Sequence, residues 1–312
     1  MSDSSETFLV TEFVLLGFPE LCHLHGLLFG SFLTIYIVTI LENLVITVVI
    51  RASHQLHTPM YFFLADLSVL ETLYTSVTVS KLLAGLLVQA KTISFSGCLT
   101  QLFLFLSLAS SECFLLATMA CDRYLAICHP LRYSAIMDSR MCLHLALSAW
   151  LGGFLASFVS MALISHLSFC GPNVLNHFFC DISPLLQLSC SDTTATEILD
   201  FVAAVAVLMT SLLVIMVSYA HILAMVLRIS GGAGRWKAFS TCASHLVVVA
   251  IFYTTTIFMY ARPHADSSFD VNKLVSVIYT VVTPLLNPII YCLRNRDIRE
   301  GLAKLLWTTG PS

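Results

Sequence analysis

Charged residues are scarce in this sequence of 312 residues: Asp, Glu, Lys and Arg together make up 11%, while hydrophobic residues make up 58%. A soluble globular domain carries about a quarter charged residues, because its surface faces water. The composition therefore excludes an ordinary soluble domain and indicates a chain whose main solvent is lipid. The formal net charge of −3 says nothing about partners, because it averages a basic face and an acidic face.

Motifs that carry catalysis are also absent from the sequence. We find no Gly-x-Ser-x-Gly, no His-Glu-x-x-His and no glycine-rich phosphate loop. The sequence therefore predicts that the protein is not an enzyme. It also shows no internal repeat, which argues against a secondary transporter built from inverted halves. A retinal-binding opsin would need a lysine within the seventh apolar stretch, and the lysine there, Lys273, falls at its outer start.

The N-terminal segment lacks the features of a cleaved signal peptide. It has no basic start and no small-residue cleavage site, so we expect the first apolar stretch to direct membrane insertion. The sequence also contains no Asn-x-Ser/Thr glycosylation sequon. Neither end carries a lipidation motif.

Long apolar stretches dominate what is present. A helix needs about 20 mostly apolar residues to cross a bilayer. Seven stretches meet that length, at residues 26–50, 59–87, 99–127, 141–163, 198–227, 238–260 and 274–293. They predict an all-α membrane protein that forms one seven-transmembrane domain over residues 1–312, with the helix bundle at 26–293. After it, residues 294–306 alternate basic and apolar residues at helical spacing, which predicts a short amphipathic helix on the membrane.

Lys and Arg are distributed unevenly among the predicted loops, and cytoplasmic loops are the ones that retain positive charge. One set of loops and helix ends holds Arg51, Arg123, Arg132, Arg140, Arg228, Arg235, Lys237, Arg294, Arg296, Arg299 and Lys304. The opposite set holds Lys91, Arg262 and Lys273. We therefore expect residues 1–25 to be extracellular and residues 294–312 to form a cytoplasmic tail.

The eleven cysteines divide by side of the membrane. Four lie in or beside predicted outer loops, where oxidation is expected: Cys98, Cys170, Cys180 and Cys190. Four cysteines permit three connectivities, and the residues alone leave all three open. Most of the others, which include Cys113, Cys121, Cys128, Cys242 and Cys292, are expected to be small apolar packing residues.

Four long sequence strings, in order, carry a family resemblance. They are PMYFFLADLS (59–68), MACDRYLAICHPLRY (119–133), KAFSTCASHL (237–246) and PLLNPIIYCLRNRD (284–297), with HFFCD (177–181) between the second and third. Together they closely resemble the odorant receptors of the rhodopsin-like G-protein-coupled receptor family, over about residues 13–306. The sequence departs from that pattern at Glu42, Cys121 and Thr254, where the family usually has glycine, tyrosine and glycine.

The resemblance implies a plasma-membrane receptor that binds a small, mostly apolar odorant. It also implies a partner, a heterotrimeric G protein of the stimulatory type, and a rise in cyclic AMP. Beyond membrane lipid we expect no further class of partner and no nucleic acid. We expect no required cofactor. The disulfide pairs implied are Cys98–Cys180 and Cys170–Cys190. His177, Cys180 and Asp181 could also bind copper or zinc, but a disulfide at Cys180 would leave no thiolate for that metal.

Acids within the predicted membrane spans form a second group of candidates: Glu42, Asp66, Glu71 and Glu112. A charge in hydrocarbon costs roughly 3 kcal/mol or more, so each should face the bundle and have a partner. The resemblance places Asp66, Glu112 and Asn287 around one buried polar site. Such an oxygen-rich site suits a bound sodium ion. The alternative is that the acids are protonated and hydrogen-bonded to neighbours.

The expected switch for the G protein lies at the cytoplasmic ends of the helices. Arg123 can pair with Asp122 while the bundle is closed, and the resemblance implies that it swings toward Tyr219 when the bundle opens. Pro284 and Pro288 predict a kink in the seventh helix. The full set of expected switch residues is Asp122, Arg123, Tyr124, Tyr219, Asn287 and Tyr291.

The resemblance also supplies an expected ligand pocket in the outer half of the bundle. Its residues are Phe105, Leu106, Ala109, Ser110, Ala203, Ala204, Val207, Tyr253, Thr256, Ile257, Tyr260 and Thr280. This set is apolar with a few hydroxyls, as suits a small hydrophobic molecule. It contains no charged residue, so an amine or carboxylate ligand is not expected.

Overall fold

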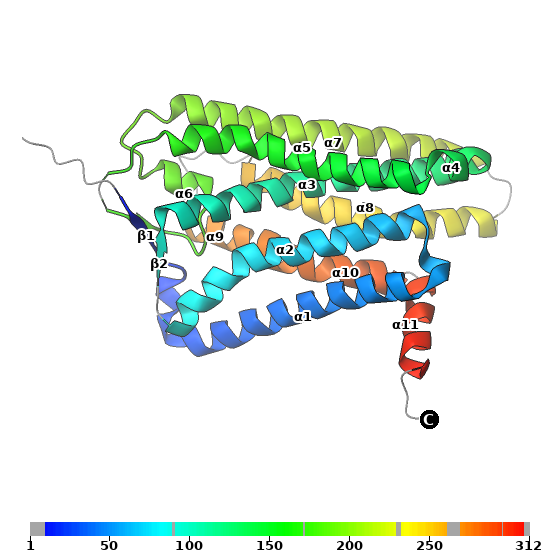
Figure 1. Ribbon diagram of the computed structural model, residues 1–312, viewed down its shortest axis with the longest axis horizontal. Helices are drawn as coiled ribbons and strands as arrows, with labels where there is room; N and C mark the ends of the chain where they lie inside the picture. The colour runs from blue at the N-terminus through cyan, green and yellow to red at the C-terminus, as the bar shows by residue number, and fades with distance from the viewer. Residues whose placement is uncertain are drawn as a thin grey trace, which may run out of the picture.

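The fold is a bundle of long helices that run side by side (Figure 1). The computed structural model describes residues 10–88, 91–170, 172–228, 232–260, 269–294 and 296–308. Its long helices are α1 (His25–Ala52), α2 (Pro59–Val88), α3 (Phe95–Cys128), α5 (Ser139–Ser165), α7 (Thr194–Arg228) and α8 (Gly232–Tyr260). A last element combines α9 (Phe269–Val277), the π-helical turn η3 (Ile278–Val282) and α10 (Thr283–Arg294). The seven predicted spans correspond to these seven elements.

Within the described residues, six of these helices are long and apolar enough to cross a membrane. The seventh apolar helix is the shorter stretch Cys242–Phe258 of α8. This confirms the prediction of a seven-helix membrane bundle. Side chains such as Leu27, Leu151 and Leu155 are largely exposed on its outer surface, as expected where the surrounding solvent is lipid.

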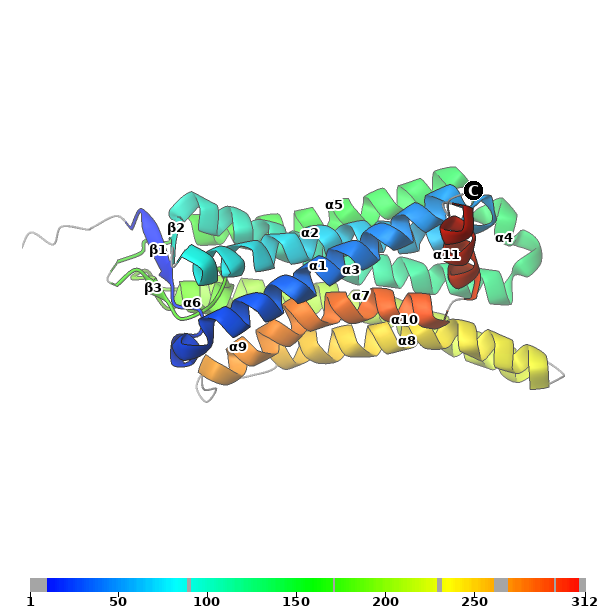
Figure 2. The same cartoon turned by 90° about the horizontal axis from the view of Figure 1, so that it is seen from below.

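Short elements close the two ends of the bundle. At one end lie η1 (Pro19–Leu24), α6 (Ile182–Leu186) and a small sheet; at the other lie η2 (His54–Leu56), α4 (Pro130–Ile136) and α11 (Arg296–Thr308). The expected C-terminal helix is α11, which runs across the end of the bundle (Figures 1 and 2). Ile298 on α11 is buried, and Lys304 Nζ donates a hydrogen bond of 3.2 Å to Gln55 Oε1.

The small sheet was not predicted from the sequence. Its order is β2 (Thr92–Ser94), β1 (Glu12–Leu15) and β3 (Val174–Leu175), with β1 antiparallel to β2 and parallel to β3. Phe13 on β1 is fully buried against the rings of Phe95 and Phe169. Strand β1 therefore packs on the loop between α5 and α7.

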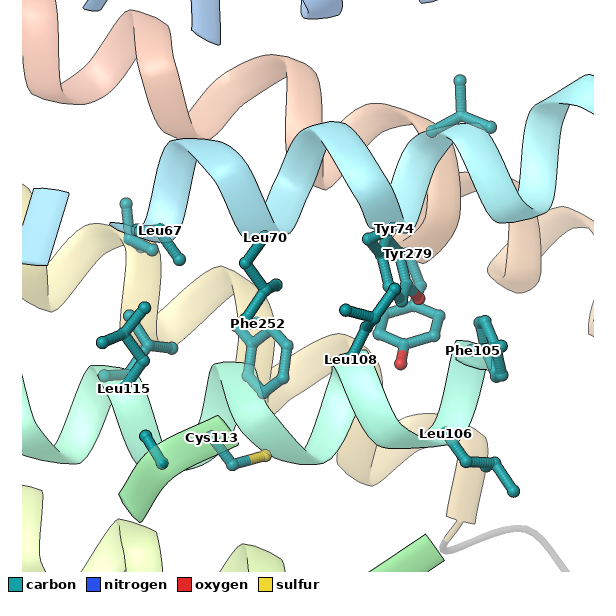
Figure 3. Close-up of a cluster of buried hydrophobic side chains, with 14 of the residues drawn as sticks. Leu67, Leu70, Tyr74, Phe105, Leu106, Leu108, Cys113, Leu115, Phe252 and Tyr279 are labelled. Atoms are coloured by element: carbon teal, nitrogen blue, oxygen red, sulfur yellow. The ribbon is translucent and has the colours of Figure 1, made fainter. Parts of the chain in front are cut away.

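The core lies between α2, α3, α8 and the α9–η3–α10 element. Leu70 of α2, Leu115 of α3 and Phe252 of α8 are fully or nearly fully buried and point into the space between these helices (Figure 3). α5 also approaches α3 very closely. A Cβ atom built on Gly153 would lie 2.6 Å from the carbonyl oxygen of Ser107, so only glycine allows this approach.

A chain of aromatic rings leads from the N-terminal segment into the bundle. Phe18 stacks on Phe178 with ring centroids 5.6 Å apart, and Phe178 contacts Phe179 at 5.0 Å. Phe179 contacts Phe105 at 4.9 Å, and Phe105 meets Tyr279 edge-on at 5.9 Å. The loop between α5 and α7 and the helix core are therefore in continuous contact.

Candidate functional site

A cavity opens between α3, α5, α7 and α8. Seven of the residues expected in the ligand pocket line it, on three of those helices: Leu106, Ala109, Ser110, Ala203, Ala204, Val207 and Thr256. The lining also includes residues that the sequence analysis did not select: Cys113, Ala156, Ser157, Ser160, Asp200, Leu208, Phe252 and Tyr279. The cavity is therefore mostly apolar, with hydroxyls and one carboxyl group on its wall.

Four of the expected pocket residues do not line this cavity: Phe105, Tyr253, Ile257 and Thr280. Phe105 packs against the rings of Phe179 and Tyr279, and Tyr253 OH donates a hydrogen bond of 2.6 Å to Ser211 Oγ. Thr280 is fully buried and donates to the carbonyl oxygen of Ser276 at 2.7 Å.

Ile257 is 45% exposed, because it lies one position beyond Thr256 and therefore about 100° around the helix. The side chain of the remaining candidate, Tyr260, lies outside the described residues.

Asp200 is the main residue that the sequence analysis missed. It lies in the first two turns of α7 and accepts a hydrogen bond of 2.7 Å from Ser160 Oγ on α5. It is an acid inside the predicted span 198–227, so the search for intramembrane acids could have found it. The wall of this cavity therefore carries a carboxyl group, whereas the pocket residues expected from the sequence include no charged side chain.

Two disulfide bonds hold the loop between α5 and α7, at the end of the bundle that carries the small sheet. The structure joins Cys98 to Cys180 with Cα atoms 5.5 Å apart, and Cys170 to Cys190 with Cα atoms 5.9 Å apart. The backbone N–H of Cys180 also donates to Gln101 Oε1 at 3.1 Å. Because Cys180 is oxidised in this structure, it offers no thiolate to a copper or zinc ion.

Two titratable groups lie in the same loop, of which His177 is buried and Asp181 is half-buried. Burial, with a smaller contribution from the charge of Lys273, lowers the pKa of His177 to about 3, so His177 is neutral at ordinary pH. Its Nε2 lies 3.2 Å from Ser276 Oγ. Burial also raises the pKa of Asp181 to about 6, opposed by a hydrogen bond from the backbone of Ile182 and assisted by the charge of Asp200.

A second polar site lies deeper in the bundle. Asn287 Nδ2 on α10 donates a hydrogen bond of 2.7 Å to Glu71 Oε1 on α2, and both side chains are 1% exposed. Glu71 also interacts electrostatically with Glu112 and Glu42 and is hydrogen-bonded by Asn43. The structure therefore brings two of the three expected sodium-site residues, Glu112 and Asn287, to the same acid.

Asp66, the third residue expected at the sodium site, lies elsewhere. Trp150 Nε1 on α5 donates to its two carboxyl oxygens at 3.1 and 3.3 Å. Five residues separate Asp66 from Glu71, which places them about 140° apart around the helix. Glu71 therefore replaces Asp66 at the polar site. Among the described residues, no three His, Cys, Asp or Glu side chains are grouped as a metal site.

The expected switch residues lie toward the opposite end of the bundle. Asp122 accepts a hydrogen bond of 2.7 Å from Tyr133 OH on α4, and Arg123 is 7% exposed. Burial and the neighbouring carboxyl of Asp122 raise the pKa of Tyr133 well above its ordinary value. Asp122 therefore has a bonding partner besides Arg123, which the sequence analysis did not anticipate.

Two tyrosines of the switch set also have partners. Tyr219 OH on α7 lies 2.7 Å from Nδ1 of His245 on α8, and the two rings stack at 5.7 Å. Tyr124 OH lies 3.1 Å from His129 Nε2. The side chain of Tyr291 lies outside the described residues.

Comparison with known proteins agrees with this architecture. The sequence model of the olfactory receptor family matches residues 32–309. The chain is 54% identical to rat olfactory receptor 226, over 95% of this chain and 92% of that protein. It is 54% identical to human olfactory receptor 6A2, over 94% and 91%, and 52% identical to mouse olfactory receptor 6B9, over 95% and 94%. The chain therefore belongs to the olfactory receptor family, and it is a multi-pass membrane receptor of the G-protein-coupled class, not an enzyme.

Proposed function

We propose that this receptor binds a small, mostly apolar odorant in the cavity between α3, α5, α7 and α8 and activates a G protein of the stimulatory type, which raises cyclic AMP. The observation that carries the proposal is the cavity itself. It is lined by residues of four helices and by Tyr279 of η3, with mainly apolar side chains, as small-molecule sites usually are.

Helix α8 is the element that could report binding to the other end of the bundle. Phe252 and Thr256 line the cavity, while His245, two turns earlier on the same helix, contacts Tyr219. Seven residues of α-helix span about 10 Å, so a rigid shift of α8 at the cavity also displaces His245. Arg123 interacts electrostatically with both His245 and Tyr219.

The G protein would bind at the end of the bundle that carries α4 and α11. Separation of α7 from α8 would break the contact between Tyr219 and His245 and open a space beside Arg123. This orientation places the N-terminal strand outside the cell and the C-terminus in the cytoplasm of a plasma-membrane receptor. The excess of Lys and Arg in the loops at the α4 end supports that assignment.

The polar site around Glu71 would suit a sodium ion. Three of its oxygens, Glu42 Oε2, Asn43 Oδ1 and Asn287 Oδ1, are buried and accept no hydrogen bond from the described residues. Unsatisfied oxygens next to the acids Glu71 and Glu112 are a fitting ligand set for a small hard cation. We expect Glu112→Gln to remove any dependence of odorant potency on sodium concentration, and an unchanged dependence would exclude this site.

The proposal is tested by cyclic AMP measurements in cells that express the receptor with a stimulatory G protein. Ala204 lines the cavity, so Ala204→Phe places a ring inside it. Val205 is the next residue of α7 and is exposed, so Val205→Phe adds the same ring outside the cavity. We expect Ala204→Phe and Arg123→Ala to lose the odorant response and Val205→Phe to keep it. If the wild-type receptor is displayed at the cell surface and answers no odorant in a broad panel, the function is wrong.

A further inference from the structure

Asp200 lies at the wall of the cavity, where Ser160 donates a hydrogen bond to it. Its Oδ1 accepts the 2.7 Å hydrogen bond from Ser160 Oγ, and Ser160 is itself only 4% exposed. Both residues line the cavity, one from α7 and the other from α5. A carboxylate offers about four acceptor positions, so a single hydroxyl donor leaves most of them unused.

Three hydroxyl groups of the cavity wall already donate their hydrogen atoms to other acceptors. Ser157 Oγ donates to the carbonyl oxygen of Gly153 at 3.0 Å, and Thr256 Oγ1 donates to that of Phe252 at 2.8 Å. Ser160 donates to Asp200. These three hydroxyls therefore present acceptor lone pairs to the cavity, and a ligand that matches them must bring its own donors.

The charge around the cavity also has one sign. Asp200 is the one charged side chain among the described residues that line it, and no lysine or arginine is among them. A second acid, Asp181 in the disulfide-bonded loop, is close enough to interact with Asp200 electrostatically. A carboxylate in apolar surroundings is costly unless a cation or several donors accompany it.

We propose that the preferred ligands of this cavity are small organic amines, whose protonated nitrogen is bound by Asp200 while the hydrocarbon part packs on the apolar lining. The inference deepens the proposed function, because it rests on this cavity being the odorant site. It reverses the expectation from the sequence, which found no charge in the pocket. The ammonium supplies three donors and the missing positive charge.

The ligand series that tests the inference keeps the carbon chain constant and changes only the polar end. Straight-chain primary amines are compared with the corresponding alcohols and methyl ethers, by their half-maximal concentrations for cyclic AMP production. Charge-assisted hydrogen bonds are roughly twice as strong as neutral ones, so we expect the amine to be more potent than the alcohol by about tenfold or more. The ether, which has no donor, should be the weakest.

The matched variants are Asp200→Asn and Asp192→Asn. Asp192 lies just before the same helix, is exposed, and accepts hydrogen bonds from Thr194 that asparagine can also accept. We expect Asp200→Asn to weaken the amine response by about 30-fold, which at 1.4 kcal/mol per tenfold is about 2 kcal/mol, and Asp192→Asn to leave it unchanged. Asp200→Glu should keep the preference for amines.

The outcomes separate the two proposals. If neutral odorants activate the receptor but amines give no advantage, or if Asp200→Asn weakens amines and ethers equally, the amine assignment fails while the odorant function stands. If no compound acts on a receptor that is displayed at the surface, the proposed function itself fails. Should Asp200→Asn not reach the surface, the wild-type series alone decides, because an ether as potent as the amine overturns the inference.

Discussion

Asn287 and Glu71 are joined by a 2.7 Å hydrogen bond although 216 residues separate them in the sequence. The bond links α10 to α2 in a part of the bundle where both side chains are almost fully buried. An unpaired polar group in such a place costs about 1–3 kcal/mol, so the pair constrains how the two helices can pack.

Glu71→Ala should therefore destabilise the receptor. The substitution leaves the amide of Asn287 without its acceptor, and we expect a loss of about 1–3 kcal/mol, seen as a lower thermal denaturation temperature of the solubilised protein. Glu197→Gln is the control, since Glu197 is exposed and glutamine keeps an acceptor for the Thr193 hydroxyl. Equal stability of the two variants would refute a structural role for the pair.

Gly153→Ala should disrupt the contact between α3 and α5. The added methyl group would lie 2.5 Å from the backbone nitrogen of Ser111 and 2.6 Å from the carbonyl oxygen of Ser107, and backbone atoms cannot move away cheaply. Overpacking of this kind costs about 1–3 kcal/mol, and we expect reduced surface display. Gly30→Ala, where no atom lies within 4 Å, should be displayed normally.

Loss of the disulfide between Cys98 and Cys180 should weaken the outer end of the bundle more than loss of the second disulfide. The first closes a loop of 82 residues and the second one of 20, and longer loops gain more from closure. We expect Cys98→Ser to cost about 2–4 kcal/mol and to abolish the odorant response. Cys170→Ser should be milder, and Cys121→Ser, which changes a free cysteine, should have little effect. Thermal stability and surface display of the three variants measure these effects. A larger loss for Cys170→Ser than for Cys98→Ser would contradict the prediction.

His177 and Asp181, in the loop between α5 and α7, should act on stability in opposite directions. The pKa of His177 falls from 6.5 to about 3 in the fold, so its contribution is complete above pH 6.5 and is lost as the pH falls toward 3. The pKa of Asp181 rises from 3.8 to about 6, so its contribution is complete below pH 3.8 and is lost as the pH rises through 6.

Between about pH 4 and 6 these effects oppose one another, and single variants should separate them. We expect His177→Gln to make the folded receptor less sensitive to acid and Asp181→Asn to make it more sensitive. Thermal denaturation of the purified receptor across this pH range measures both. Parallel curves for the wild type and both variants would mean that neither group titrates with a shifted pKa.

The membrane spans could be predicted because each is a long apolar run, and a bilayer imposes a minimum length on a helix. The small sheet of β1, β2 and β3 could not be predicted from the sequence. Its longest strand has four residues, too few for an alternating pattern, and its pairing with β2 and β3 depends on residues far along the chain.

The candidate sites were predictable only in part. A sequence shows that Asp66 and Glu71 are both intramembrane acids, but their neighbours decide which one meets Asn287. Asp200 was missed because the pocket residues came from the family resemblance, which describes what members share. The contact of Asp200 with Ser160 of α5 becomes visible only in the three-dimensional structure.

The ring chain from Phe18 to Tyr279 has a practical consequence for anyone who shortens this receptor. Tyr279 lines the cavity, and four ring contacts in sequence connect it to a residue that precedes α1. A truncated version that began at α1 would keep every membrane helix and yet lose Phe18, the first ring of the series that ends at Tyr279 in the cavity wall. A shortened version of the receptor should therefore keep the residues from Phe18 onward.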